Sequence, residues 1–354
     1  MLIYLFSYVK VQKNTVFAFL LLFLYHNLIS MDKFELIKKP VASELDEFKA
    51  LFDSSLCSET PLLNEALNYI KKRNGKMMRP ILVLLMAKLF GTSNEATKHV
   101  ALALELLHTA SLVHDDVVDE SDKRRGQRSV NAVYNNKVSI LVGDYMLATS
   151  LKHAAWSGKI ELVDLVARLG QELAEGEIIQ LSNTSNESFS ENIYFEVIRK
   201  KTAALFVASA ESGAISVDAS KENVDLAALY GELIGIAFQI KDDIFDYFPN
   251  PNLGKPTGND MVEGKLTLPA LYVLNKLNDE GLNELALRIR SLEATPEEIS
   301  NFVEVVKREG GIEYAEKVMY DYRNKAMAVL PQKIDPALYD ALAAYIDYVI
   351  ERKI

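Results

Sequence analysis

Two aspartate clusters with the same spacing constrain the fold of this chain more than any other feature of its sequence. In each cluster, acids stand at positions i, i+1 and i+4. On a helix, residues i and i+4 lie on one face, and residue i+1 lies about 100° further round the axis. Each cluster therefore directs at least two carboxylates to one side of a helix. The clusters read Asp115-Asp116-Val-Val-Asp119 and Asp242-Asp243-Ile-Phe-Asp246.

Both clusters are embedded in apolar sequence with helical periodicity. Long helices are expected at His99–Glu120, Val138–Trp156 and Val224–Phe248, and the first and third of these contain the clusters near their ends. Carboxylates in an apolar helix are costly unless cations or metal ions compensate their charge. We therefore expect the two clusters to face a shared cavity that binds metal.

The rest of the chain also has the pattern of helices. Thr60-Pro61 and Thr295-Pro296 are helix-start signals, and no run alternates apolar and polar residues over a useful length, so strands are not expected. There is no low-complexity linker and no repeat of fixed period. We predict an all-α fold: one domain, residues 31–354, in which long core helices form a bundle around a central active-site cavity.

The first 30 residues differ from this pattern. Val16 to Tyr25 is an apolar run of ten residues, which is too short to span a bilayer. Met31 is followed by Asp-Lys-Phe-Glu, which is typical of a cytosolic start. We interpret residues 1–30 as a hydrophobic leader outside the fold that stems from a mis-assigned start. A membrane-tethering leader and a cleaved signal peptide stay open as alternatives.

Composition excludes several classes of function. The chain has 354 residues and a formal net charge of -10, which argues against nucleic acid as a partner. Its single cysteine, Cys57, rules out an intramolecular disulfide and a zinc site built from several cysteines. A reducing compartment, the cytoplasm, is therefore the expected location.

The spacing of the acids favours a hard divalent cation. Mg²⁺ usually takes one or two protein carboxylates and completes its shell with water and substrate phosphates. Two facing acid clusters would repel each other in a low-dielectric cavity, and several Mg²⁺ ions with a diphosphate would relieve that repulsion. A diphosphate also needs direct cationic contacts. Cations stand beside both clusters or at turns that could reach them: Lys76, Arg79, Arg124, Arg125, Lys201, Lys255 and Lys265.

In combination, these motifs resemble those of the trans-isoprenyl diphosphate synthases, the polyprenyl synthetase family, in its long-chain branch. The likeness covers roughly residues 40–350. It rests on the stretch from His108 to Gly126 with the first cluster, on Leu-Val-Gly143-Asp144-Tyr145, on Lys201-Thr202-Ala-Ala-Leu-Phe, and on Phe238-Gln239-Ile-Lys241 before the second cluster. The resemblance implies a fold of the isoprenoid synthase type.

The resemblance also implies the reaction. Isopentenyl diphosphate would condense head to tail onto an allylic diphosphate, farnesyl or geranylgeranyl diphosphate, with several Mg²⁺ ions per site. No side chain would act as a nucleophile. The family is commonly homodimeric, and loose contact with a membrane would suit the release of a long product.

Roles for individual residues follow from the matching motifs. The catalytic set would be Asp115, Asp116, Asp119, Lys201, Asp242 and Asp243. The Mg²⁺ ligands would be Asp115, Asp119, Asp242, Asp243 and Asp246. The allylic diphosphate would contact Arg124, Lys255 and Lys265, and the developing allylic charge would lie near Lys201, Thr202 and Gln239. Isopentenyl diphosphate would be held by Lys76, Arg79, His108 and Arg125.

The helix before the first cluster bears on product length, because the growing chain runs beside it in the family. Ser111 and Ala110 stand four and five positions before Asp115, where short-chain relatives carry a bulky aromatic residue that acts as a floor. Both are small, and Leu107 is the next candidate for a floor. We therefore expect a product near C40, of the kind used for quinone side chains.

Three other functions stay open. The first is a shorter-chain synthase that makes geranylgeranyl or farnesyl diphosphate. The second is a class I terpene cyclase, although a cyclase needs no second diphosphate site. The third is a regulatory subunit of a heteromeric synthase, although such subunits typically lose one acid cluster and both are intact here.

Overall fold

A computed structural model describes residues 33–72, 75–124, 126–182, 189–249 and 257–351 of the chain. The interpretation of residues 1–30 as a leader lies outside the described residues. Residues 33–38 are helical and lead directly into a short 3₁₀ helix, η1 (Lys39–Val41).

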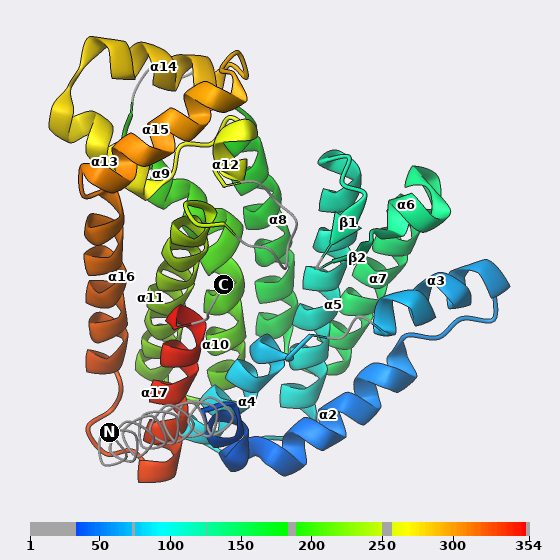
Figure 1. The fold of residues 1–354 in the computed structure, drawn as a ribbon. Helices are drawn as coiled ribbons and strands as arrows, with labels where there is room; N and C mark the ends of the chain where they lie inside the picture. The colour runs from blue at the N-terminus through cyan, green and yellow to red at the C-terminus, as the bar shows by residue number, and fades with distance from the viewer. Residues whose placement is uncertain (1–32, 73–74, 125, 183–188, 250–256, 352–354) are drawn as a thin grey trace, which may run out of the picture.

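Long helices run up and down through the molecule, and shorter ones close its ends (Figure 1). The first half consists of η1 (Lys39–Val41), α2 (Ala42–Ser55), α3 (Pro61–Lys71), α4 (Met78–Phe90), α5 (Glu95–Val118), β1 (Lys123–Arg124), β2 (Gln127–Arg128), α6 (Val130–Tyr134), α7 (Asn136–Trp156) and α8 (Ile160–Ser182). The second half consists of α9 (Glu191–Ile198), the π-helical segment η3 (Arg199–Ala203), α10 (Ala204–Ser216), α11 (Lys221–Asp246), α12 (Asn259–Val262), α13 (Leu268–Leu277), α14 (Glu280–Arg290), α15 (Pro296–Arg308), α16 (Gly311–Ala328) and α17 (Pro336–Ile350).

The structure confirms the all-α prediction, with one small correction. The three long helices expected from the sequence are α5, α7 and α11. Strands were not expected, and the described residues contain one antiparallel pair of two-residue strands, β1 and β2. This hairpin turns back at Gly126, whose φ of +74° is a left-handed conformation that glycine adopts at little cost. Two residues a strand leave no alternating pattern for sequence reasoning to detect.

Local sequence explains where the helices begin. Helix α3 starts at Pro61 and α15 at Pro296, as the sequence predicted. At α15, Thr295 and Glu298 form a capping box, in which each side chain accepts a hydrogen bond from the other residue's backbone N–H. Asn94 and Thr97 form a similar box at the start of α5. The first acid helix thus has a fixed beginning several turns before its acids.

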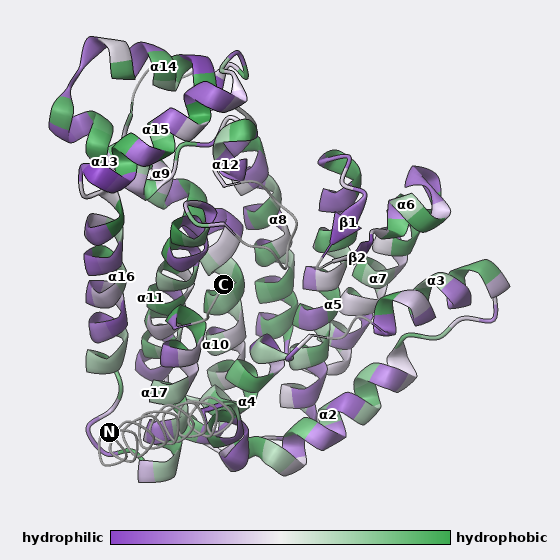
Figure 2. Ribbon diagram, in the orientation of Figure 1, coloured by the Kyte–Doolittle hydropathy of each residue, from purple (hydrophilic) through white to green (hydrophobic). Residues whose placement is uncertain are grey.

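The core lies between α4, α5, α7, α10 and α11, and apolar residues concentrate there (Figure 2). Helix α16, at the edge, is banded with hydrophilic residues in the same view. Hydrogen bonds tie the core helices together: Ser150 Oγ of α7 donates to the carbonyl of Ala103 in α5, at 2.7 Å. No helix in the described ranges is both long and apolar enough to cross a membrane.

Two glycines bring the second acid helix against the helix before it. A Cβ added at Gly231 would lie 2.5 Å from the carbonyl oxygen of Phe206, and one added at Gly235 would lie 2.5 Å from the Cα of Ala203. The backbones of α11 and of the η3–α10 segment are therefore in direct contact. Gln239, one turn after Gly235, consequently reaches Thr202 of η3, and Asp243, two turns after it, reaches Tyr194 of α9.

Candidate active site

The first acid cluster forms the last turn of α5 and the residue after it. Asp115 is half-buried, Asp116 is buried with 2% of its surface exposed, and Asp119 is exposed just beyond the helix. Arg124 of the β1–β2 hairpin donates from Nε to Oδ1 of Asp116 at 2.6 Å. The hairpin thus folds back onto the helix end and places a cation against the middle acid.

Burial raises the pKa of Asp115 above the usual aspartate value. The neighbouring cation Lys201 opposes this shift, whereas the nearby Glu177 carboxylate reinforces it. Asp115 therefore lies where several acids and a lysine meet, and its charge depends on cations that enter the same space.

The second acid cluster lies on α11, and its middle acid is again the most buried of the three. Asp242 and Asp246 are half-buried, whereas Asp243 is 2% exposed. The hydroxyl of Tyr194, on α9, donates to Oδ2 of Asp243 at 2.5 Å, and Nε2 of Gln239 donates to Oδ1 at 2.8 Å. Both oxygens of the middle carboxylate thus accept hydrogen bonds from neutral side chains.

Charge and burial act together on this buried carboxylate. Burial raises the pKa of Asp243 well above its usual range, and the charges of Asp260 and Asp242 raise it further, while the two hydrogen bonds oppose the shift. Burial, followed by the charge of Asp243, also raises the pKa of the Tyr194 hydroxyl, which therefore stays protonated and donates. Asp260 additionally donates its backbone N–H to Oδ2 of Asp246, at 3.1 Å.

The π-helical segment η3 positions two predicted residues beside the acids. Thr202 Oγ1 donates to Oε1 of Gln239 at 2.7 Å, which extends the hydrogen bonds of Asp243 by one link. Lys201 Nζ lies 2.5 Å from Oε2 of Glu177 and 3.2 Å from Oε1 of Gln180, both on α8. Such π-helical turns occur frequently at functional sites.

A glycine on α8 allows this arrangement. A Cβ added at Gly176 would lie 3.0 Å from the backbone nitrogen of Lys201, so α8 passes close to η3. The next residue, Glu177, is consequently within reach of the Lys201 ammonium group.

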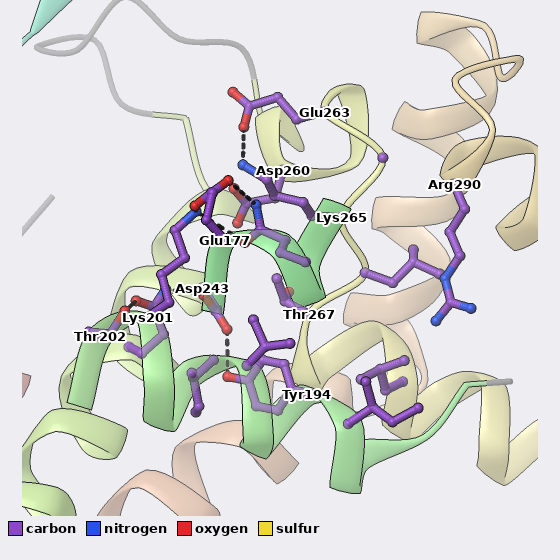
Figure 3. Close-up of a pocket in the computed structure, with 18 of the residues that line it drawn as sticks. Glu177, Tyr194, Lys201, Thr202, Asp243, Asp260, Glu263, Lys265, Thr267 and Arg290 are labelled. Atoms are coloured by element: carbon purple, nitrogen blue, oxygen red, sulfur yellow. Dashed lines mark hydrogen bonds and ion pairs between the residues drawn. The ribbon is translucent and has the colours of Figure 1, made fainter. Parts of the chain in front are cut away.

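A cavity of about 600 Å³ has acids of both clusters in its lining. Figure 3 shows Asp243 and Tyr194 on one side of it, with Lys201, Glu177 and Lys265 nearby. Its lining includes Asp119 from the first cluster and Asp243 from the second, with Lys201, Thr202, Gln239 and Lys265. Burial lowers the pKa of Lys265, but the carboxylates of Glu263, Asp260 and Asp119 outweigh it and the net shift is upward. Lys265 is thus a cation in this cavity at neutral pH.

A second cavity, of about 530 Å³, is lined by residues from Glu105 to Asp116 of α5 and by residues of α4 and α17. Its cationic and titratable lining residues include Lys76, Arg79, His108, Arg124 and Asp116. Helix α17 contributes Tyr348, whose hydroxyl accepts a hydrogen bond from Lys76 and whose ring centroid lies 4.8 Å from the Lys76 ammonium nitrogen. The guanidinium carbon of Arg79 lies 6.0 Å from the ring centroid of Phe206.

The structure brings most of the predicted residues together, but not in one space. Asp119, Asp243, Lys201, Thr202, Gln239 and Lys265 line the first cavity; Lys76, Arg79, His108, Arg124 and Asp116 line the second. Arg124 was expected at the allylic diphosphate, and the structure places it on the side of the second cavity. Arg125 and Lys255 lie outside the described residues.

The residues expected to govern product length lie in the packed part of α5. Ala110 is fully buried, Leu107 is 4% exposed, and Ser111 is half-buried with its hydroxyl donated to the carbonyl of His108 at 2.9 Å. In the described part of the chain, the linings of the two cavities include none of these three residues. Their role stays a prediction.

Sequence reasoning missed several residues of the first cavity: Glu177, Tyr194, Asp260 and Arg290. Asp260 stands five residues after Lys255 in Gly254-Lys255-Pro-Thr-Gly258-Asn-Asp260, close to a cation that the sequence did single out, so a signal was available. Tyr194 stands seven residues before Lys201, but a tyrosine in an apolar helix is ordinary core and gave no signal. Arg290 comes from α14, far along the chain from both clusters.

The donor set fits magnesium. Carboxylate oxygens are the ligands that Mg²⁺ prefers, and each cluster supplies one acid, Asp119 or Asp243, to the lining of a cavity that also holds Lys201 and Lys265. Among the described residues, no group of three or more histidine, cysteine or acidic side chains could hold a metal ion by itself. Mg²⁺ at these acids would therefore need water and a diphosphate to complete its shell.

Comparisons with known proteins point in the same direction. Residues 60–306 match the family model described as polyprenyl synthetase. Heptaprenyl diphosphate synthase component 2 of Geobacillus stearothermophilus is 34% identical over 310 residues, which are 86% of this chain and 96% of the relative. Octaprenyl diphosphate synthase of Escherichia coli K12 is 32% identical over 326 residues, 90% of this chain and 98% of the relative.

A solved structure described as geranylgeranyl pyrophosphate synthase from Bacteroides thetaiotaomicron is more similar in sequence. It is 54% identical, superposes with a TM-score of 0.80, and the match covers 91% of this chain and all of that one. The proteins similar to this chain therefore carry names with different product lengths.

Proposed function

The chain belongs to the polyprenyl synthetase family, and on that premise we propose that it is a long-chain polyprenyl diphosphate synthase. It is a prenyltransferase, as its relatives are. We propose that it condenses isopentenyl diphosphate head to tail (1′-4) with an allylic diphosphate, and that the product is near C40. The observation that carries this proposal is the cavity that Asp119 of the first acid cluster and Asp243 of the second line together with Lys201 and Lys265.

The first cavity would bind the allylic diphosphate. Mg²⁺, when bound by Asp115, Asp119, Asp242, Asp243 and Asp246, would neutralise the diphosphate and assist its departure as a leaving group. Lys265 and Lys201 would add positive charge where the leaving oxygens become more negative. The Thr202 hydroxyl and the Gln239 amide, fixed by their mutual hydrogen bond, would face the carbon from which the diphosphate departs.

The second cavity would hold isopentenyl diphosphate. Lys76, Arg79 and His108 line it, and its wall contains apolar residues of α5 and α17 that would contact the hydrocarbon part. Walls of this kind exclude water, which would otherwise quench an allylic carbocation. The double bond of isopentenyl diphosphate would attack that cation, and the proton lost afterwards would pass to the departing diphosphate.

Product length is the open part of the proposal. The small side chain of half-buried Ser111 supports a long product, because a bulky residue there would close the path beside α5. The 54% identical structure described as geranylgeranyl pyrophosphate synthase favours a second candidate, a C20 product. Ser111→Phe should shorten the product, and Ala110→Phe, at the buried neighbour, is the companion variant. An unchanged distribution of product lengths in both would contradict the argument from α5.

Three further properties belong to the proposal. We propose a homodimer in the cytoplasm that makes quinone side chains, with peripheral membrane contact when the product leaves. Exposed apolar residues on α7 and α8, among them Leu141, Leu151 and Ile178, support an interface on that side. Light scattering of the purified protein would measure the oligomeric state.

One experiment tests activity, metal requirement and length together. Purified protein is incubated with labelled isopentenyl diphosphate, farnesyl or geranylgeranyl diphosphate, and Mg²⁺, and the products are separated by chromatography. We expect linear all-trans products that depend on Mg²⁺. A cyclic hydrocarbon made without isopentenyl diphosphate would indicate a terpene cyclase instead. Activity that arises only after addition of a second protein would indicate a subunit of a heteromeric synthase.

A further inference from the structure

We infer that Tyr194 is a positioning residue for the second acid cluster: its hydroxyl fixes the carboxylate of Asp243 and thereby the direction in which this cluster faces the first cavity. The inference rests on the proposed function, because it concerns how the cluster receives Mg²⁺ and diphosphate. Tyr194 lies in no motif that pointed to the site.

Each oxygen of the Asp243 carboxylate accepts a hydrogen bond from a neutral side chain. Tyr194 is buried on α9 and donates to one carboxylate oxygen at 2.5 Å, while Gln239 donates to the other at 2.8 Å. An ionised carboxylate offers about four lone-pair sites, two on each oxygen. The two donors occupy one lone-pair site on each oxygen and hold the plane of the Asp243 carboxylate. The remaining site on each oxygen is therefore held in one orientation.

Tyr194 also connects the two sides of the cavity. Helix α9 continues directly into η3, so Tyr194 and Lys201 belong to one continuous backbone element. From η3, Thr202 donates to Gln239 and Gln239 donates to Asp243. The Tyr194 hydrogen bond therefore closes a loop of contacts between the segment that carries Lys201 and the helix that carries the acids. Loss of the hydroxyl would open this loop at the acid.

A second tyrosine that is hydrogen-bonded to α9 offers a matched control. Tyr314, on α16, donates its hydroxyl to Oε2 of Glu191 at 2.9 Å, and Glu191 is the first residue of α9. Tyr194 and Tyr314 thus each donate to a carboxylate and each tie α9 to a neighbouring helix. Tyr194 lines the first cavity, whereas Tyr314 and Glu191 are not part of its lining in the described structure. A purely structural role for the hydroxyl predicts similar effects at both positions.

The test compares Tyr194→Phe with Tyr314→Phe in the full chain. For Tyr194→Phe we expect the Mg²⁺ concentration needed for half-maximal activity to rise about 10–100-fold, which is the usual effect of removing a group that orients metal ligands. The KM for isopentenyl diphosphate, the substrate of the other cavity, should change little. Tyr314→Phe should leave both quantities as in the unmodified protein.

A binding measurement independent of turnover accompanies the kinetics. Mg²⁺ with inorganic diphosphate should raise the unfolding temperature of the unmodified protein and of Tyr314→Phe by the same amount. The rise should be smaller for Tyr194→Phe at the same concentrations. Equal rises in all three proteins, together with an unchanged Mg²⁺ requirement, would overturn the inference.

A double variant shows whether Tyr194 acts through Asp243. In the background of Asp243→Asn, Tyr194→Phe should add no further increase in the Mg²⁺ requirement, because the group that it orients is already altered. Additive effects would show that the two residues act separately and would contradict the inference. If the unmodified protein makes no prenyl product, the proposed function fails; if it is active and Tyr194→Phe matches it, only the role of Tyr194 fails.

Discussion

Asp116 and Asp243 occupy equivalent positions in the two acid clusters, yet the protein holds them by different means. Both are 2% exposed, and in both clusters the acid before them is half-buried. Asp116 accepts a hydrogen bond from the guanidinium group of Arg124, a cation. Asp243 accepts its hydrogen bonds from the neutral groups of Tyr194 and Gln239.

This difference changes how the negative charge of each buried acid is compensated. At the first cluster, the charge of Arg124 offsets the charge of the buried acid. At the second, the donors are neutral, and burial with the charges of Asp260 and Asp242 raises the pKa of Asp243 instead. The ionised form of the middle acid is therefore less favoured at the second cluster than an ordinary aspartate would be, and this cluster should depend more strongly on Mg²⁺.

The largest effect should come from the acids that both clusters need. Asp115→Ala and Asp242→Ala, made separately, should each lower kcat for product formation by about 10²–10³-fold or more, because each removes charge that would stabilise the departing diphosphate through Mg²⁺. Asp122→Ala, at an exposed acid just beyond the first cluster, is the control and should stay active. Full activity of either cluster variant would refute a site shared by the two helices.

A smaller effect should separate the two ways of holding the middle acid. Arg124→Met leaves the Asp116 carboxylate buried without that cation and should lower the free energy of unfolding by about 1–3 kcal/mol. Gln239→Met removes one of two neutral donors from Asp243 and should cost about 0.5–1.5 kcal/mol. Urea unfolding of the metal-free protein measures both. Equal costs would mean that the charge of Arg124 contributes nothing beyond its hydrogen bond.

Protons should compete with Mg²⁺ at the first cluster. Burial raises the pKa of Asp115, so this acid takes up a proton at higher pH than an exposed aspartate would. Only the ionised form binds metal, so kcat/KM should fall as the pH is lowered toward that raised pKa. A tenfold increase in free Mg²⁺ should move this acid limb by up to about one pH unit toward lower pH. If the acid limb of the pH profile stayed at the same pH when free Mg²⁺ was raised, protons and Mg²⁺ would not compete at Asp115.

The smallest effect is expected at the outer end of the hydrogen bonds around Asp243. Thr202→Val keeps the shape of the side chain but removes the donor to Gln239, at a cost of about 0.5–1.5 kcal/mol in the free energy of unfolding. Activity should fall only a few-fold, since Gln239 and Tyr194 still hold the acid. Thr202→Ser, which keeps the hydroxyl, should have the activity of the unmodified protein. If Thr202→Val lost as much activity as Asp242→Ala, Thr202 would have a more direct role.

The sequence predicted the helices and the acids because both leave regular patterns. Apolar periodicity identified α5, α7 and α11, and the spacing i, i+1, i+4 singled out the clusters on the first and last of them. Capping residues such as Thr295 identified helix starts to within a residue. These features depend on residues that are close together in the chain, so their patterns are visible in the sequence.

The parts that could not be predicted depend on contacts between distant segments. Nothing near Tyr194 in the sequence shows that its hydroxyl meets Asp243, 49 positions later. The position of Arg124 at the second cavity depends on its contact with Asp116, which the β1–β2 hairpin makes by folding back onto the end of α5. The approach of α8 to η3 at Gly176 needs the packing of both segments, and a lone glycine within a helix does not indicate which segment lies against it.

The contact between Lys76 and Tyr348 has a consequence for how the protein is made. These residues are 272 positions apart, and both line the second cavity. A chain still emerging from the ribosome can contain both acid clusters long before α17 exists. The second cavity is complete only when α17 has been synthesised and has docked. Catalytic competence should therefore arise only after α17 has left the ribosome, and a chain released before α17 should fail to extend a prenyl substrate.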